Sequence, residues 1–274
     1  MKPVINIVTR FSRTEGIERC LSSLYEQTYN NIHHIITYET DELKEYLDAK
    51  VNHSITTMVR VPNLERIQGL CRFYNHHDRV LNYLNPNKEF INLKISIDGK
   101  DPSPNENIPV EPQKYWKGSW WCMDLPHSIR VREPHFPYNQ YMKIAERAYK
   151  EGWIVFLDDD DTWVSKDSLE IIAAHINQHD TDTIHLWKFY TVRDGVKPHD
   201  NYWNYMKASH PFIVGSIASG CYAYHTKYSQ YSQWDEWSGG DYRTLKALEQ
   251  IGFKKNFIDE VLYSHDRDIW IENR

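Results

Sequence analysis

The sequence predicts an α/β protein with a Rossmann-like, mostly parallel central sheet flanked by helices. One pattern, found in two parts of the chain, predicts this class. Apolar runs rich in β-branched residues alternate with helical apolar stripes before residue 62 and again after residue 137. Such alternation is typical of a parallel sheet wound with crossover helices. Because 274 residues can form one large domain and no stretch is typical of a linker, we expect a single domain over residues 1–274.

The first half begins with an expected strand over Val4–Thr9, followed by a polar break. A helix should come next, because apolar residues recur at i, i+3, i+4 and i+7 over Ile17–Leu24. The alternation continues with a strand over Ile32–Tyr38, a helix over Asp41–Ala49 and a strand over Ser54–Val61. This order predicts the first three strands of a parallel sheet.

The segment 63–136 interrupts the alternation. It holds short helical stripes, an apolar run over Phe90–Asp98, a loop rich in Pro and Asn, and an aromatic cluster over Tyr115–Trp121. Because the segment is short of a core of its own, we interpret it as an insertion that decorates the domain.

The alternation resumes after the insertion. Asn139 can cap a helix that runs to Lys150, and the apolar run Trp153–Leu157 predicts a buried strand. The remaining expected elements are a helix capped by Ser165 or Asp167, strands over Thr183–Val192 and Phe212–Tyr224, a helix with Leu245, Leu248 and Ile251 on its apolar face, and closing strands over Phe253–Ile258 and Val261–Ser264.

Four consecutive aspartates, Asp158 to Asp161, follow the strand predicted over Trp153–Leu157. On an extended segment Asp158 and Asp160 point to one face, and Asp159 and Asp161 to the other. Two carboxylates about 6–7 Å apart repel by roughly 2–3 kcal/mol at an effective dielectric of about 20. A hard divalent cation removes this repulsion. The pattern therefore indicates a metal or active site, with a solvated acidic turn or a helix start as the alternative.

Polar residues also follow the first two expected strands. Thr9 and Arg10 end the first strand, and Glu39 ends the second. Ligands of open α/β sheets bind outside the carboxyl ends of the strands. We therefore expect these residues and the aspartates to converge on one crevice.

The composition excludes some classes of protein. The net charge of −6 and the absence of a basic stretch argue against a nucleic-acid surface. No segment approaches the roughly 18 apolar residues of a membrane span. The four cysteines are scattered without CxxC pairs, which is typical of a reducing compartment. We expect a soluble, cytoplasmic protein of unknown oligomeric state.

Several segments resemble the family-2-type glycosyltransferases of the GT-A fold. The segments that carry the resemblance are the strand Ile5–Thr9, the helix Ile17–Thr28, the strand Ile35–Glu39, the block Pro137–Gln140, the strand and aspartates Gly152–Asp161, the helix start Gly240–Arg243 and the closing strand Val261–His265. They cover roughly residues 3–61 and 137–267. The resemblance implies a GT-A-type single domain that transfers a sugar from a nucleotide-diphosphate donor to a hydroxyl of an acceptor, such as a glycan.

The resemblance also implies a donor site. The nucleobase would lie against Thr9 and Glu39, although the second strand usually ends in two aspartates where this chain has Tyr38 and Glu39. Asp158 would lie near the ribose. Three more residues are placed in the nucleotide-sugar site with them: Arg10, Asn139 and Asp159.

For the metal and the chemistry, the resemblance implies a Mn²⁺ or Mg²⁺ ion on Asp160, with His265 completing its site. Asp241 would be the catalytic base, next to Gly240 where the family usually has Glu. A cation neutralises the departing diphosphate, a carboxylate accepts the proton of the attacking hydroxyl, and a single displacement inverts the anomeric centre. The alternatives are a plain helix cap for Asp241 and a structural role for His265.

The acceptor would be bound by inserted segments and by aromatic residues in the second half. Trp234 and Trp237 lie just before Asp241, and tryptophan faces stack well on sugar rings. Core packing is the alternative for either ring.

Two other functions compete with glycosyl transfer. The run that ends in Asp158, Asp160 and Thr162 also fits the DxDxT motif of haloacid-dehalogenase-type phosphohydrolases, in which Asp158 would be a nucleophile. That motif normally opens the core domain, whereas here three expected strands precede it. The second competitor is a Ca²⁺-dependent carbohydrate-binding module, although the EF-hand spacing is absent.

Overall fold

The computed structural model describes residues 2–12, 14–61, 93–97, 118–122, 130–131, 135–191, 195–198, 200–212, 217–234 and 240–265, with the backbone alone in 93–97, 118–122, 130–131, 135–138 and 140. The chain divides into two compact units. The first comprises Met1–Val61, Tyr141–Gln233 and Asp241–Arg274, and the second comprises Pro62–Gln140 and Trp234–Gly240. The second unit contains the expected insertion, and the expectation of one domain over 1–274 stays a prediction.

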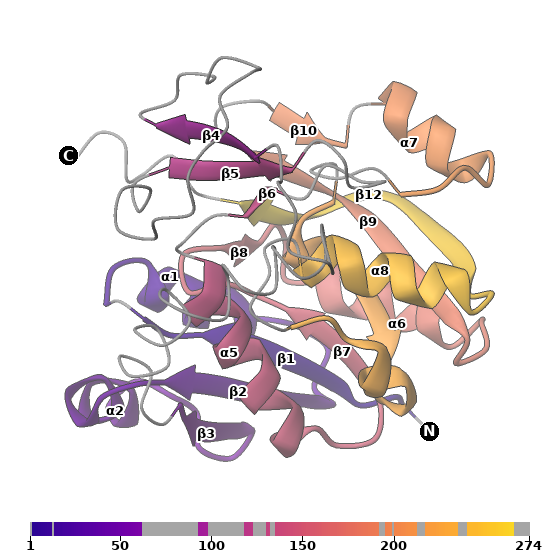
Figure 1. Cartoon of the computed structure of the whole chain (residues 1–274). Helices are drawn as coiled ribbons and strands as arrows, with labels where there is room; N and C mark the ends of the chain where they lie inside the picture. The colour runs from indigo at the N-terminus through magenta and orange to yellow at the C-terminus, as the bar shows by residue number, and fades with distance from the viewer. Residues whose placement is uncertain are drawn as a thin grey trace. The chain divides into compact units, whose positions relative to one another are not determined.

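The first unit is built on a nine-stranded sheet in the order β3-β2-β1-β7-β11-β9-β12-β8, with β10 paired to β9. Its strands are β1 (Ile5–Arg10), β2 (Ile32–Tyr38), β3 (Thr56–Arg60), β7 (Trp153–Phe156), β8 (Thr162–Trp163), β9 (Thr183–Thr191), β10 (Gly195–Lys197), β11 (Tyr222–His225) and β12 (Lys254–His265). Figure 1 shows β2, β1 and β7 side by side, and all three run parallel. The mostly parallel sheet flanked by helices confirms the predicted fold class.

Helices connect these strands. They are α1 (Ile17–Tyr25), α2 (Asp41–Asp48), α5 (His135–Ala145), α6 (Ser168–Ile176), α7 (Asp200–Lys207) and α8 (Gly240–Gln250), with short 3₁₀ turns at Glu146–Ala148, Ser219–Cys221 and Thr226–Tyr231. Helix α1 buries the four apolar residues of its expected stripe, which are Ile17, Cys20, Leu21 and Leu24. The side chain of Thr40 caps α2 by accepting a hydrogen bond from the Leu43 amide at 3.3 Å. The helices and strands expected before residue 62 are therefore confirmed, and their ends differ from the prediction by at most two residues.

Helix α5 begins earlier than expected. It starts at His135, so Asn139 lies inside the helix and the prediction that Asn139 caps it is wrong. The reason is Pro137, which is tolerated in the first turn because amides there have no partner within the helix. The helix also ends sooner, at Ala145, and a 3₁₀ turn follows.

The strand expected over Phe212–Tyr224 is confirmed only at its end, in β11, because the 3₁₀ turn Ser219–Cys221 precedes β11 and residues 213–216 lie outside the described residues. The backbone of Gly220 packs directly on the ring of Tyr263, where a Cβ would lie 2.0 Å from a ring carbon. This close contact replaces the regular strand that the apolar residues suggested.

The elements near the end of the chain differ from the sequence prediction in two respects. The two expected closing strands form one strand, β12, which stays continuous through register shifts between Ile258 and Tyr263. Ile251 was expected on the apolar face of the preceding helix, yet it lies beyond α8 and is 46% exposed. Gly252 ends that helix with a φ of +89°.

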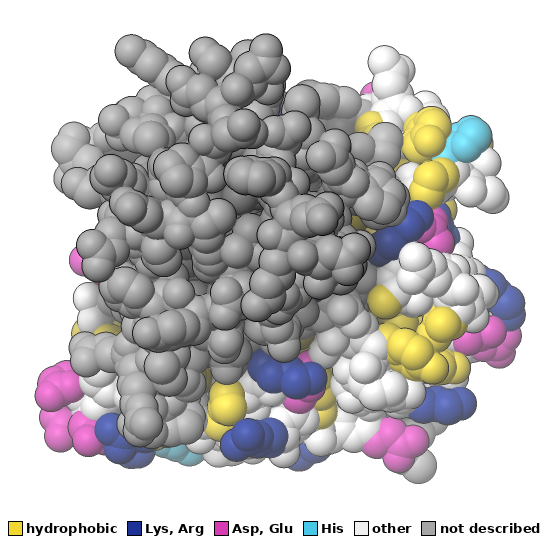
Figure 2. Space-filling model, in the orientation of Figure 1, with side chains coloured by type: hydrophobic (Ala, Val, Ile, Leu, Met, Phe, Trp, Pro, Cys, Tyr) yellow, Lys and Arg dark blue, Asp and Glu magenta, His cyan; other side chains and the backbone are white. Residues whose placement is uncertain are grey.

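The described part of the second unit contains an antiparallel sheet of β4 (Leu93–Ile97), β5 (Gly118–Cys122) and β6 (Arg130–Val131). The expected strand over Phe90–Asp98 is thereby confirmed in its central part, while the expected helices and the Pro- and Asn-rich loop lie outside the described residues. None of the helices in the described ranges has the length and apolar character needed to cross a membrane. On the described part of the face in Figure 2, acidic and basic side chains lie next to one another.

Candidate active site

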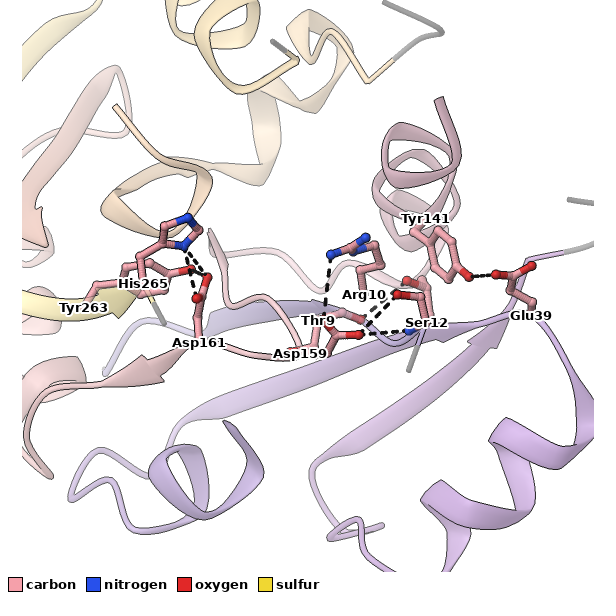
Figure 3. Close-up of polar contacts among 10 residues, drawn as sticks. Thr9, Arg10, Ser12, Glu39, Tyr141, Asp159, Asp161, Tyr263 and His265 are labelled. Carbon is pink, nitrogen blue, oxygen red and sulfur yellow. Dashed lines mark hydrogen bonds and ion pairs between the residues drawn. The ribbon is translucent and has the colours of Figure 1, made fainter. Parts of the chain in front are cut away.

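The site lies where parallel strands of the first unit end. β2, β1 and β7 run in one direction, and β9 runs the same way because β11 is antiparallel to both β7 and β9. β12 is parallel to β9, so its end lies at the same edge of the sheet. The polar residues found at these strand ends are Arg10, Glu39, Asp158 to Asp161, and His265. Figure 3 shows the contacts of Arg10, Glu39, Asp159, Asp161 and His265.

The four aspartates form a tight turn. The amide of Asp161 donates a hydrogen bond of 3.0 Å to the carbonyl oxygen of Asp158, and β7 has already ended at Phe156. The prediction that alternate aspartates share a face is therefore wrong, because it applies only to extended backbone. All four side chains are nonetheless buried, so the alternative of a solvated acidic turn is wrong as well.

Gly16 supports this turn from the loop before α1. Its φ is +85° and its ψ is −31°, and a Cβ there would lie 2.9 Å from the Cα of Asp160 and 3.1 Å from the carbonyl oxygen of Asp159. Only glycine allows both this backbone conformation and this close approach. The sequence analysis passed over this residue.

Asp159 fixes one side of the turn. Its Oδ2 accepts a hydrogen bond of 3.0 Å from the amide of Ser12, whose hydroxyl lies 3.4 Å away, and its Oδ1 lies 3.7 Å from a guanidinium nitrogen of Arg10. These contacts connect the aspartate turn to the end of β1. Beside them, Tyr141 donates a hydrogen bond to Glu39 at the end of β2. Ser12 and Tyr141 carry no sequence signal that singles them out.

Asp161 fixes the other side. It accepts hydrogen bonds from the hydroxyl of Tyr263 and from Nδ1 of His265, which lies 3.0 Å from Oδ2 and 3.1 Å from Oδ1. His265 was expected to complete a metal site with Asp160; the structure shows its hydrogen bond to Asp161, and the metal role stays a prediction. Asp159 and Asp161 are thus the anchors of the turn.

Asp158 carries an electrostatic cost. Burial raises the pKa of Asp158 to about 7, with a further rise from the other three aspartates, while the guanidinium of Arg10 opposes the shift. Its Oδ1 is buried and has no hydrogen-bond partner among the described residues. Buried polar atoms are normally paired, so an orphaned carboxylate oxygen beside three other carboxylates is suited to a cation or a ligand hydroxyl.

Comparisons with known proteins bear on the fold. No protein-family model and no curated protein matches the chain. Among solved structures, residues 1–349 of S. aureus TarS in complex with UDP match with a TM-score of 0.55 at 14% identity, over 96% of this chain and 60% of that one. The same TarS fragment in complex with UDP-GlcNAc gives 0.50 at 14% identity, over 97% and 58%. A longer TarS chain gives 0.51 at 13% identity, over 96% and 36%.

The fold is that of a GT-A glycosyltransferase. This chain spans about 60% of the length of the TarS fragment. In this fold Arg10, Glu39 and the aspartates lie at the strand ends, where topology predicts ligand binding, and the crevice itself stays a prediction.

The structure also shows the contacts of two other predicted site residues, Thr9 and Asp241. The hydroxyl of Thr9 lies 3.1 Å from Nε2 of His34, so the Thr9 side chain forms a hydrogen bond within the sheet. Asp241 lies in the first turn of α8, where the amide of Tyr242 donates a hydrogen bond of 2.7 Å to its Oδ1. Burial, with a smaller contribution from the charge of Asp241, raises the pKa of Cys221.

Three predicted site residues, Asn139, Trp234 and Trp237, belong to the second unit. Asn139 is buried inside α5, and Trp234 is only 2% exposed, as core packing requires. Trp237 lies outside the described residues. The roles of all three in donor or acceptor binding stay predictions.

Proposed function

We propose that the chain is a metal-dependent, inverting glycosyltransferase that moves a sugar from a nucleotide-diphosphate donor to a hydroxyl of an acceptor, with a glycan as the expected acceptor. The observation that carries the proposal is the buried aspartate turn, anchored next to Arg10 and His265 at the strand ends of a GT-A fold. TarS has been solved with UDP and with UDP-GlcNAc, so uridine donors are the first to test.

Donor binding follows from the residues at the ends of β1 and β2. Tyr141 holds one carboxylate oxygen of Glu39, which orients an acceptor of hydrogen bonds at the end of β2. A nucleobase that presents an N–H donor, as uracil does at N3, matches that acceptor. Arg10 places a positive charge beside Asp159 and is the described residue that would face a negatively charged donor.

A divalent cation fits the donor set of the turn. The orphaned Oδ1 of Asp158 and the carboxylate of Asp160 are hard oxygen ligands, and His265 adds an imidazole. Within the described ranges, no group of three or more His, Cys, Asp or Glu is arranged to hold a metal ion. When bound, Mn²⁺ or Mg²⁺ neutralises charge on the departing diphosphate.

Asp241 is the proposed base. As the acceptor oxygen attacks the anomeric carbon, the bond from that carbon to the diphosphate oxygen breaks, and the hydroxyl proton passes to the Asp241 carboxylate. The hydrogen bond from the Tyr242 amide fixes the orientation of that carboxylate at the helix N-terminus. Attack opposite the leaving group inverts the anomeric centre.

The experiment uses the full chain with a panel of nucleotide sugars, with and without Mn²⁺, and measures nucleoside diphosphate release and transfer to hydroxyl acceptors. We expect metal-dependent turnover of one donor and a loss of roughly 10²–10⁴-fold in Asp241→Asn. Asp200→Asn is the matched control, because Asp200 also begins a helix but its side chain is 83% exposed. Near wild-type transfer by a folded Asp241→Asn variant would contradict the assignment. Phosphate release from a simple phosphomonoester, with no nucleotide-sugar turnover, would favour the phosphohydrolase.

A further inference from the structure

The pairing of Asp161 with His265 follows from strand register. β8 is antiparallel to β12, with Tyr263 opposite Trp163 and Ser264 opposite Thr162. The next pair along this register is Asp161 opposite His265. Side chains directly opposite in an antiparallel pair lie close together, so the fold brings these two residues into contact although they are 104 positions apart in the chain.

The contact has the features of a built site. The side chain of Asp161 is completely buried, and that of His265 is 16% exposed. The imidazole has two aromatic neighbours: it is nearly parallel to Tyr263 at a centroid distance of 6.4 Å and edge-on to Phe189 at 6.3 Å. Tyr263 is itself held by the backbone of Gly220 and the ring of Trp163. The ring of His265 is thus fixed in orientation as well as in position.

The chemistry of the carboxylate decides where the proton lies. An ionised carboxylate can only accept hydrogen bonds, so Nδ1 of His265, within 3.1 Å of both oxygens of Asp161, must be the donor. Nε2 is then the nitrogen that can lose its proton and offer a lone pair. Histidines that ligate metals usually donate their other ring N–H to a carboxylate in this way.

We propose that Asp161 is a positioning residue that holds His265 in the Nδ1–H form, so that Nε2 is the nitrogen that binds the divalent cation. The inference rests on the proposed function, because it names the ligand atom and its orienting partner. If the pair had a purely structural role, its hydrogen bond would only hold β8 against β12, and its loss would not change metal binding.

The first test reads the proton position in the metal-free protein. Long-range ¹H–¹⁵N correlation spectra of histidine-labelled protein, recorded at about pH 8 where an ordinary imidazole is neutral, distinguish the two forms, and His265→Gln identifies the signal. We expect Nδ1–H in the wild type and, in Asp161→Asn, a change to Nε2–H, because the amide of the new side chain can donate to Nδ1. A wild-type signal of the Nε2–H form would overturn the proposal without any variant having to fold.

The second test measures Mn²⁺ binding in the presence of UDP from the spin-resonance signal of free Mn²⁺. We expect Asp161→Asn to weaken Mn²⁺ binding roughly 10–100-fold. Tyr263→Phe is the matched control, because it removes the other hydrogen bond to the same carboxylate and should keep the Nδ1–H form. An Asp161→Asn variant that changes the proton position but keeps its Mn²⁺ affinity would overturn the proposal.

The two proposals fail in different ways. Absence of sugar transfer with intact Mn²⁺ and UDP binding would contradict the proposed function and leave the role of Asp161 supported. Absence of Mn²⁺ binding by the wild type in the presence of UDP would overturn both the metal dependence and this inference.

Discussion

Replacing Gly16 by alanine tests whether the loop before α1 holds the aspartate turn. A Cβ at this position would lie 2.9 Å from the Cα of Asp160, which is backbone and cannot rotate away. The backbone is also unfavourable for any residue with a side chain, since φ is +85°. Forcing a side chain into a positive-φ conformation costs roughly 1–2 kcal/mol, and the overpacked contact adds roughly 1–3 kcal/mol. We expect the variant to lose about 2–5 kcal/mol of unfolding free energy.

Gly252 is the matched control for this change. Its φ is +89°, almost the same as that of Gly16, but a Cβ there would meet no atom within 4 Å. Gly252→Ala should therefore lose only the backbone contribution of roughly 1–2 kcal/mol. The difference between the two variants isolates the contact with the aspartate turn.

Urea unfolding of the wild type and both variants measures these free energies, and calorimetry with UDP and Mn²⁺ measures donor binding. Because Asp160 must move in Gly16→Ala, we expect that variant to lose about tenfold or more in UDP affinity, equivalent to about 1.4 kcal/mol. Gly252→Ala should bind UDP like the wild type. Equal destabilisation of the two variants, with UDP affinity unchanged in both, would refute the view that Gly16 positions the turn.

Three further predictions concern single side chains. The pKa of Asp158 is raised from 3.8 to about 7, so the folded state keeps a proton that the unfolded state loses between these values, and the stability contribution of this carboxyl falls as pH rises through that window. The stability advantage of Asp158→Asn over the wild type in urea unfolding should grow by up to about 4 kcal/mol from about pH 4 to pH 8, and an advantage that shrinks as pH rises would contradict this. Burial lowers the pKa of His34 from 6.5 to about 3, so its contribution is lost as pH falls below about 6.5, and His34→Asn should unfold with a weaker dependence on pH between about 6.5 and 3. Glu39→Gln should weaken UDP binding by about tenfold in calorimetry if its carboxylate accepts from the nucleobase, and unchanged affinity would exclude that contact.

Much of the fold could be predicted because its signals are local. The stripe from Ile17 to Leu24 marks the buried face of α1, and the β-branched run Ile32–Tyr38 coincides with β2. The gathering of polar residues at one edge of the sheet could also be predicted, since parallel strands bring their carboxyl ends to one edge. Arg10 and Glu39 were identified on that argument alone.

The interior of the site could not be predicted, because it depends on contacts between distant segments. The strand β8 has only two residues, too few for a periodic signal, yet its register against β12 places Asp161 beside His265. The extended-strand argument placed Asp159 and Asp161 on the face opposite to Asp158 and Asp160, and that argument fails in a turn. Gly16 looks like an ordinary loop glycine until the aspartate backbone is seen against it.

The distribution of contacts along the turn separates anchoring from function. Asp159 is held by Ser12 and Arg10, and Asp161 by Tyr263 and His265, so the polypeptide has arranged partners at both positions. Asp158 has a buried oxygen without a hydrogen-bond partner among the described residues and a pKa raised mainly by its burial. Stability alone would favour a neutral side chain at this position, because an unpaired buried carboxylate costs free energy that packing does not return. A turn that is fixed at two aspartates and strained electrostatically at a third is therefore better explained by a ligand with positive charge than by the needs of the fold.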